Sequence, residues 1–200
     1  MAASSTSTFS ALRLLSNLFP GLGRPPTSWE KGAAGEEAVA RRLEKLPPHE
    51  WIALHDLPLG SGGRNVDHLV IGARGIFSLN TKNLSGNVVV KRNAFLVGGF
   101  GDRCLHVARD EASKVGERLT LAVGEPVHVN PVIVVLAPAL VVDSQPDDVH
   151  VAGIDEIVRW LTSRPEVLGA RMASRTYEAA RRRRTWTEDV SALAPFLETR

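Results

Sequence analysis

Two short apolar runs joined by a glycine-bracketed turn constrain the fold of this chain more than any other feature. Residues 66–71 and 76–82 have the composition and length of β-strands. Gly72 and Gly75 flank the two residues between the runs, so a two-residue loop is enough to close a β-hairpin. The two turn residues, Ala and Arg, fit the favoured two-residue turns poorly, so the glycines carry this prediction.

The hairpin register brings polar side chains together beside apolar strands. If Gly72 pairs with Gly75, Asp67 lies opposite Asn80, with Cβ atoms roughly 5 Å apart. Alternate residues share a face, so Asn80 and Lys82 point the same way. Burying an acid, an amide and an ammonium is costly unless they pair or bind something. One interpretation is a structural ion pair between Asp67 and Lys82.

Metal-dependent phosphodiester cleavage is the other interpretation of these residues. An Asp on one strand and an x-Lys pair on the next suit this chemistry, because the carboxylate and an oxygen from the second strand can hold Mg²⁺. The lysine then orients water or stabilises charge on the phosphate. The pattern predicts Asp67 and Asn80 as metal ligands and Lys82 as the charge-stabilising group.

A fourth polar candidate lies on the first predicted helix, residues 30–46, which Thr27 or Ser28 can cap. Glu36 falls on the apolar face of this helix and Glu37 on the solvated side. We therefore choose Glu36 as a carboxylate aimed at the sheet. The alternative is that Glu36 only favours the helix N-terminus through the helix dipole, worth roughly 0.3–1 kcal/mol.

Arginine makes up 19 of the 24 basic residues, and it is the better bidentate phosphate binder. A GC-rich genome also produces this bias and is the safer explanation of it, so the case for a nucleic-acid partner depends on particular residues. Arg64, in a glycine-rich loop before Asp67, is placed to meet a phosphate. Arg109 on a later helix can reach the site or a phosphate, but a solvated, charged helix face is the better explanation of this residue. A dense cluster can contact a nucleic-acid backbone, with Trp186 beside it for stacking: Arg181, Arg182, Arg183 and Arg184. Cations at a helix C-terminus are an equally good explanation of the cluster.

The remaining pattern predicts an α/β fold, a mixed β-sheet flanked by helices. A nearly continuous apolar run at residues 127–136 suits a central strand buried on both faces. Further predicted strands cover residues 51–57, 87–90, 94–97 and 149–152. Further predicted helices cover residues 102–123, 154–163 and 165–184.

Several motifs together resemble the nuclease-related domain (NERD) family. They are Gly35-Glu36-Glu37, Asn65-Val-Asp67-His68, Gly75-Ile-Phe and Thr81-Lys82-Asn83-Leu-Ser-Gly86, and the likeness covers about residues 30–125. That family is similar to the PD-(D/E)xK nucleases, so the resemblance implies a restriction-endonuclease-like core, Mg²⁺ or Mn²⁺ as cofactor and DNA as partner. This chain departs from the pattern because Asn80 stands where the family usually has Glu.

The resemblance implies roles for four residues. Asp67 is the metal carboxylate, Asn80 a weaker metal-ligating oxygen, Lys82 the group that orients water, and Glu36 an auxiliary carboxylate. The neutral amide of Asn80 leaves a second hypothesis open, which is a catalytically degenerate nucleic-acid-binding or adaptor module.

Domain limits and compartment follow from composition. We expect a poorly ordered lead-in at residues 1–28 and one domain at 29–190, with its core at about 30–136 and a C-terminal strand and helices at 149–186. Cys104 is the lone cysteine, so a reducing, cytoplasmic compartment is the default. The apolar stretch at residues 11–19 is too short to span a bilayer, and no membrane span is expected.

Overall fold

A computed structural model describes residues 26–60 and 64–187 of the 200-residue chain. The chain divides into two compact units, residues 1–31 and residues 32–200. In the first unit, the side chain of Thr27 accepts a hydrogen bond from the Glu30 amide at 3.2 Å, and the Glu30 carboxylate accepts one from the Thr27 amide at 2.7 Å. This reciprocal pair is a capping box, so Thr27 is the cap that starts the first helix. The predicted lead-in lies outside the described residues except for residues 26–28.

The described part of the chain has one helix, six consecutive strands, a long helix, three strands and three helices, in that order. The helices are α2 (Ser28–Leu43), α3 (Cys104–Val123), α4 (Ile157–Ser163), α5 (Ala170–Ala180) and α6 (Arg183–Thr187). The strands are β1 (Trp51–Pro58), β2 (Asn65–Gly72), β3 (Gly75–Asn83), β4 (Val88–Lys91), β5 (Ala94–Val97), β6 (Phe100–Asp102), β7 (Asn130–Leu136), β8 (Leu140–Val142) and β9 (His150–Gly153).

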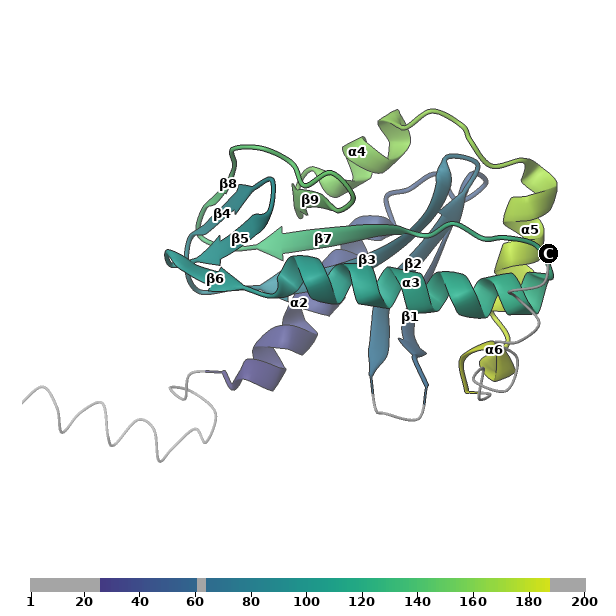
Figure 1. The fold of residues 1–200 in the computed structure, drawn as a ribbon, viewed down its shortest axis with the longest axis horizontal. Coiled ribbons are helices and arrows are strands. Elements are labelled where there is room, and N and C mark those ends of the chain that lie inside the picture. The colour runs from purple at the N-terminus through teal and green to yellow at the C-terminus, as the bar shows by residue number, and fades with distance from the viewer. Residues whose placement is uncertain (1–25, 61–63, 188–200) are drawn as a thin grey trace, which may run out of the picture. The chain divides into compact units, whose positions relative to one another are not determined.

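The main sheet has five strands in the order β1-β2-β3-β7-β9 (Figure 1). Strands β1, β2 and β3 form an antiparallel meander, and β3, β7 and β9 run parallel. A second sheet has the order β6-β5-β4-β8. The predicted fold class, a mixed sheet flanked by helices, is confirmed.

The predicted hairpin register is confirmed from Gly72↔Gly75 through His68↔Leu79. Neither turn residue has a positive φ, so the turn is not one of the favoured type I′ turns. Instead, the carbonyl oxygen of Ala73 accepts hydrogen bonds from the amides of Val167 at 2.9 Å and Leu168 at 2.8 Å. The segment between α4 and α5 therefore holds the turn that the sequence alone left poorly explained.

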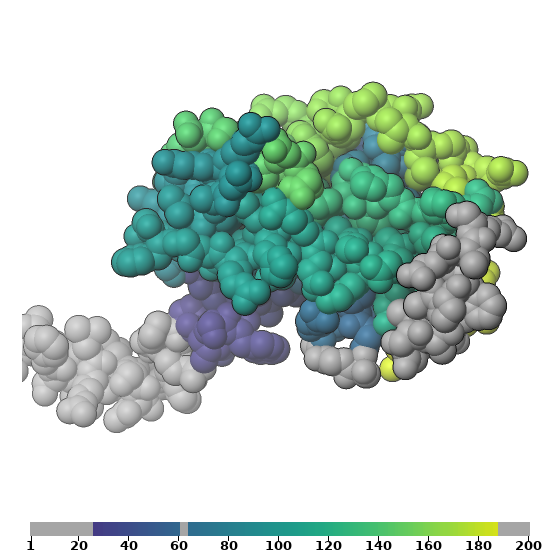
Figure 2. Space-filling view, in the orientation of Figure 1, coloured from purple at the N-terminus to yellow at the C-terminus, as the bar shows by residue number. Residues whose placement is uncertain are grey.

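Helices cover both faces of the main sheet. Successive residues of β2 point to opposite faces, and they pack in two different core clusters. Leu69 packs with Val115 and Leu119 of α3, whereas Val70 packs with Val39 of α2 and with α4. Figure 1 shows α3 running along one side of the main sheet, and teal residues occupy the middle of the same view in Figure 2. Each fully buried large apolar side chain contributes roughly 1.5–3 kcal/mol. The residues that recur at helical spacing along α3 are all buried: Leu105, Ala108, Ala112, Val115 and Leu119.

Three predictions about the elements need correction. The helix predicted at 165–184 is two helices, α5 and α6, because the chain turns at Arg181 and Arg182. The predicted strand at 127–136 begins only at Asn130, although its centre is buried as expected. Strands β6 and β8 were not predicted, and each has three residues, too few to show a period.

The expectation that the chain has no membrane span can be compared with the lengths and composition of the described helices. Across residues 26–60 and 64–187, no helix combines the length and the apolar character needed to cross a bilayer.

Candidate active site

Asp67 lies where the pairing of β2 with its neighbours is interrupted. Oδ2 of Asp67 accepts a hydrogen bond from the backbone amide of Thr81 at 2.7 Å, so the carboxylate takes the place of a backbone carbonyl. The antiparallel register consequently does not extend to Asp67 and Asn80. On the other side, pairs His55↔His68 and Leu57↔Val66 bracket Asp56, whose φ is 52°.

The backbone at Asp56 is in the left-handed region, which costs a non-glycine residue energy and is commonest at functional sites. Asp56 is exposed and accepts a 2.5 Å hydrogen bond from the side chain of Asn65. Its charge also raises the pKa of Asp67, after the larger effects of burial and Glu111. Asp56 is thus an acidic neighbour of the site that sequence reasoning missed.

Burial raises the pKa of Asp67 from 3.8 to about 6. The hydrogen bond from Thr81 and the charge of Lys82 oppose this rise, whereas the negative charges of Glu111 and Asp56 add to it. Such repulsion among acids is relieved when a cation binds between them.

Glu111 of α3 contributes the buried carboxylate nearest to Asn80. Its Oε1 accepts a hydrogen bond from the Ser78 hydroxyl at 2.7 Å, and its Oε2 accepts one from the Asn80 amide nitrogen at 3.0 Å. The residue is 8% exposed, and burial raises its pKa, against the effect of both hydrogen bonds. A carboxylate therefore lies beside the position at which the family usually has Glu on the strand.

Sequence reasoning missed Glu111, although a signal was present. Glu111 follows Ala108 by three residues and precedes Val115 by four, so it belongs to the apolar stripe of α3. A charged residue within a buried stripe is rare unless it is paired. The polar neighbours Arg109 and Asp110 obscured this interruption.

Lys82 lies near all three carboxyl groups of the site. Burial raises the pKa values of Glu36, Asp67 and Glu111, and the charge of Lys82 opposes the rise in each case. The ammonium is therefore within electrostatic range of carboxylates from α2, β2 and α3.

Glu36 reaches this group because α2 approaches β3 closely. A Cβ atom added at Gly35 would come within 2.8 Å of the Asn83 side chain, so the glycine permits the approach. Burial, and then the charges of Asp67 and Asp56, raise the pKa of Glu36. Glu37 is exposed and forms an ion pair with Arg41, as its predicted solvated position requires. The structure thus brings Glu36, rather than Glu37, toward the sheet.

The donor set suits a hard divalent cation in its chemistry. Asn80 is 6% exposed, and its Oδ1 has no hydrogen-bond partner within the described part of the chain. A buried amide oxygen without a partner is costly unless it binds something. Asp67 and Glu111 supply anionic oxygens, the ligand type that Mg²⁺ prefers.

The site offers few side chains that could bind a metal ion. Among residues 26–60 and 64–187, no three His, Cys, Asp or Glu side chains are grouped so that they could hold a metal ion. Mg²⁺ commonly retains waters and uses one or two carboxylates together with substrate phosphates. The residues present therefore fit a cation that shares its ligands with the substrate.

Two histidines lie next to the site on the face of the sheet that α2 covers, opposite the face that α3 covers. His68 is 1% exposed; its Nδ1 lies 2.8 Å from Nδ1 of His55, and its Nε2 lies 3.2 Å from the hydroxyl of Thr81. Burial lowers the pKa of His68 to about 3, so the ring is neutral at pH 7. Both rings have hydrogen-bond partners within the sheet.

Two of the basic residues predicted to bind nucleic acid, Arg64 and Arg109, form ion pairs with acidic side chains. Arg64 forms an ion pair with Asp110 at 3.3 Å. Arg109 donates two hydrogen bonds of 2.7 Å to Asp148 and lies two residues from Glu111, on the opposite side of the helix. The structure does not bring Arg109 to the carboxylates.

The arginine cluster, Arg181–Arg184, is exposed and lies beside the loop that leads to β2. The amide of Gly60, at the start of that loop, donates to the carbonyl oxygen of Trp186 at 3.1 Å. The indole of Trp186 is 1% exposed and donates to the carbonyl of Ala180 at 2.7 Å. The prediction that Trp186 is free to stack on a base is therefore wrong, because its ring fills the core.

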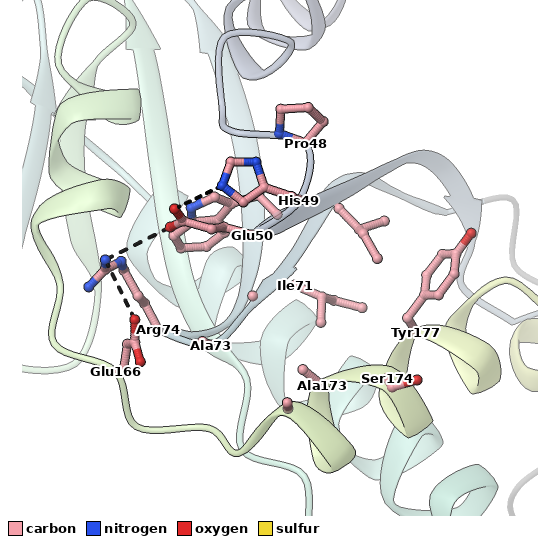
Figure 3. A pocket seen from close by; sticks show the side chains of 14 residues that line it. Pro48, His49, Glu50, Ile71, Ala73, Arg74, Glu166, Ala173, Ser174 and Tyr177 are labelled. Atoms are coloured by element: carbon pink, nitrogen blue, oxygen red, sulfur yellow. Dashed lines mark ion pairs between the residues drawn. The ribbon is translucent and has the colours of Figure 1, made fainter.

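A cavity of about 340 Å³ lies at the other end of the hairpin (Figure 3). Ile71 and Tyr177 are among its apolar lining, and Arg74 stands at one side between Glu50 and Glu166, at 3.9 and 3.8 Å. Residues of the hairpin turn line this cavity, and none of the carboxylate-site residues does, so the cavity is not part of the carboxylate site.

Comparison with known proteins identifies the family to which this sequence is similar. The sequence matches the nuclease-related domain family over residues 31–136. A curated relative, an uncharacterized protein of Bacillus anthracis, is 39% identical over 59 residues, which cover 28% of this chain and 28% of the relative. The chain thus spans little more than a quarter of that relative's length. No solved structure gives a significant match.

Proposed function

The chain belongs to the nuclease-related domain family, and from this premise we propose that it is a Mg²⁺-dependent nuclease that cleaves phosphodiester bonds in DNA. The observation that carries the proposal is the contact between Asn80 and Glu111. Asn80 lacks the negative charge that the family pattern usually has, and the Glu111 carboxylate lies within 3.0 Å of its amide nitrogen. The helix thereby supplies a carboxylate that the strand lacks.

Three residues would hold the cation. Asp67 has Oδ2 engaged with Thr81 and so offers Oδ1, and Asn80 offers its unpartnered Oδ1. Glu111 would contribute a remaining lone pair of a carboxylate whose two oxygens each accept one hydrogen bond. When bound there, a divalent cation would polarise a phosphate oxygen and acidify a water molecule.

Other groups would handle the proton and the developing charge. Lys82 is the cation near all three carboxyl groups and can orient the attacking water or stabilise negative charge on the phosphate. Glu36 is partly buried and its pKa is raised, which suits a carboxylate that accepts a proton from water near neutral pH.

The arginine cluster supports a nucleic-acid substrate. Arg182, Arg183 and Arg184 are exposed, and α6 is bonded to the loop that leads to the strand of Asp67. Cations at this end of the sheet would attract a phosphate backbone toward the carboxylates.

Cleavage by the purified full-length chain tests the proposal. Single- and double-stranded DNA are incubated with Mg²⁺ or with EDTA, using the wild type, Asp67→Ala and two matched pairs. Glu111→Gln is paired with Glu117→Gln, an exposed acid on the same helix, and Glu36→Gln with the exposed Glu37→Gln. We expect Mg²⁺-dependent cleavage that Asp67→Ala and Glu111→Gln abolish and that the two exposed-site controls retain. Cleavage that survives Asp67→Ala would mean that another site, or a contaminant, is responsible.

A second function is favoured by Asn80 itself. A neutral amide at this position and the absence of a three-acid group among the described residues suit a binding module that retains the fold without the chemistry. DNA binding by the wild type with no cleavage in Mg²⁺ or Mn²⁺ would select this alternative.

A further inference from the structure

Phe100 is 80% exposed at the start of β6, the edge strand of the second sheet (Figure 1). Burying an exposed phenylalanine is favourable, so a ring left in water invites a partner. Gly98 and Gly99 precede it with φ values of 57° and 88°, and a Cβ atom added at either would meet nothing within 4 Å. The side of the turn toward which a side chain at either glycine would point is therefore open.

The loop after β3 connects this ring to the carboxylate site. Lys82 lies near the end of β3, and four residues later Gly86 packs against the Gly98 turn. A Cβ atom added at Gly86 would come within 3.3 Å of the Gly98 amide nitrogen and of a Val97 methyl group. The ring thus follows, by two residues, a turn that contacts the loop leaving the site.

The end of β6 also lies near Lys82. The backbone amide of Cys104 donates to Oδ1 of Asp102 at 2.8 Å. Cys104, two residues after β6, packs in the same core cluster as Val135. Val135 of β7 pairs with Lys82 of β3, so the end of β6 lies close to the strand that carries Lys82.

Arg103 adds a positive charge to this surface. It is exposed, and within the described residues its guanidinium forms no ion pair. An aromatic ring followed three residues later by an uncommitted cation offers a nucleotide both a stacking surface and a phosphate partner.

We propose that Phe100 stacks on an unpaired base of a single-stranded nucleic acid whose backbone lies across the carboxylate site, with Arg103 contacting a phosphate. The inference rests on the proposed function and deepens it, because it assigns the substrate a strand form. Within a duplex the faces of the bases are stacked on one another, so away from the duplex ends an exposed ring gains this contact only from an unpaired base.

Fluorescence titration of the full-length chain tests the inference. The probes are a single-stranded oligonucleotide carrying one 2-aminopurine and its blunt duplex, both in EDTA so that neither is cleaved. Phe100→Ala should weaken single-strand binding about 5- to 150-fold, since a base–aromatic stack is worth roughly 1–3 kcal/mol. Phe100→Trp should retain the affinity, and duplex binding should change little. Val141→Ala, which shortens an exposed side chain on the other edge strand of the same sheet, is the matched control.

Three results would overturn the inference: equal losses for single strand and duplex, unchanged affinity in Phe100→Ala, or a change of oligomeric state in Phe100→Ala, which would make the ring a contact between copies. Cleavage in Mg²⁺ is measured in parallel. Cleavage without a Phe100 effect would reject only the stacking inference. Phe100-dependent binding without cleavage would reject only the proposed enzymatic activity.

Discussion

Asn80 donates a hydrogen bond of 3.0 Å to Glu111, and this contact joins β3 to α3 at the buried end of the site. The donor is the amide nitrogen, so the amide oxygen of Asn80 points elsewhere and has no partner in the described part of the chain. The amide nitrogen of Asn80 therefore binds the Glu111 carboxylate, while the amide oxygen of Asn80 remains available for a ligand.

Exchanging the amide of Asn80 and the carboxylate of Glu111 tests whether the carboxylate can lie on either β3 or α3. We expect Glu111→Gln to weaken Mg²⁺ binding by at least roughly 10- to 100-fold. The double variant Asn80→Glu/Glu111→Gln should recover much of this loss, because it returns one carboxylate and one amide to the same site. Thermal shift on adding Mg²⁺ measures the binding. An unchanged shift in Glu111→Gln would mean that Glu111 is structural.

The single variant Asn80→Glu should be less stable than the wild type without metal. It places a second carboxylate beside that of Glu111 in a buried setting, where like charges repel. The metal-free variant should therefore unfold at a lower temperature than the wild type at pH 8 and show a larger gain in Tm with Mg²⁺.

Asp67 should make the metal-free protein less stable as the pH rises. Its pKa is raised from 3.8 to about 6, so its stabilising contribution is fully present below pH 3.8 and is lost as the pH rises through 6. Asp67→Asn stays neutral and keeps an acceptor for the Thr81 amide. We expect it to exceed the wild type by about 3 kcal/mol at pH 8 and to match it near pH 4.

Urea unfolding at pH 4, 6 and 8 in EDTA checks the Asp67 prediction. The buried His68 has the opposite dependence, since its lowered pKa makes stability fall as the pH falls below 6.5. That effect is common to both proteins and cancels in their difference. A difference independent of pH would show that Asp67 is not the titrating group.

The arginine cluster should govern the salt dependence of DNA binding. Replacing Arg182, Arg183 and Arg184 with Gln should flatten the logarithmic salt slope by roughly 0.9 for each phosphate that the variant no longer neutralises. The reduction in affinity should be similar for unrelated DNA sequences, because the phosphate backbone carries no sequence information. Arg171→Gln, an exposed arginine on α5, is the control. Slopes that agree between the triple variant and the wild type would leave the cluster as a solvated helix end.

Arg74 should matter for stability rather than for cleavage. It donates a 2.6 Å hydrogen bond to the carbonyl of Arg164 and so ties the hairpin turn to the segment after α4. Arg74→Gln should lower the free energy of unfolding by about 1.5–3 kcal/mol, the range for hydrogen bonds to charged groups. The control is Arg159→Gln, whose exposed ion pair with Glu156 is worth roughly 0.5 kcal/mol. Equal free energies of unfolding for the two variants would contradict this role.

The parts of the fold that depend on neighbouring residues in the sequence were predictable. Glycines at 72 and 75 fixed the hairpin register, and the apolar period of residues 105–119 fixed the buried face of α3. Strands β6 and β8 were not predictable because their pairing, not their composition, defines them.

The candidate site was only partly accessible from sequence for a related reason. Asp67, Lys82 and Glu36 belong to motifs that can be read locally, whereas Glu111 acquires its role through a hydrogen bond to a residue 31 positions away. Trp186 shows the reverse error. Its neighbours in sequence are exposed arginines, but its own ring is enclosed because α6 turns it into the core.

The close approach of α2 to β3 has a consequence for engineering. Gly35 faces the Asn83 side chain with no room for a methyl group, so the missing Cβ sets how far Glu36 reaches. Grafting the hairpin alone onto another scaffold would leave this carboxylate behind, and the helix and its glycine have to be moved with it. Conversely, Gly35→Ala displaces Glu36 without altering a single charge, which separates the position of that carboxylate from its chemistry.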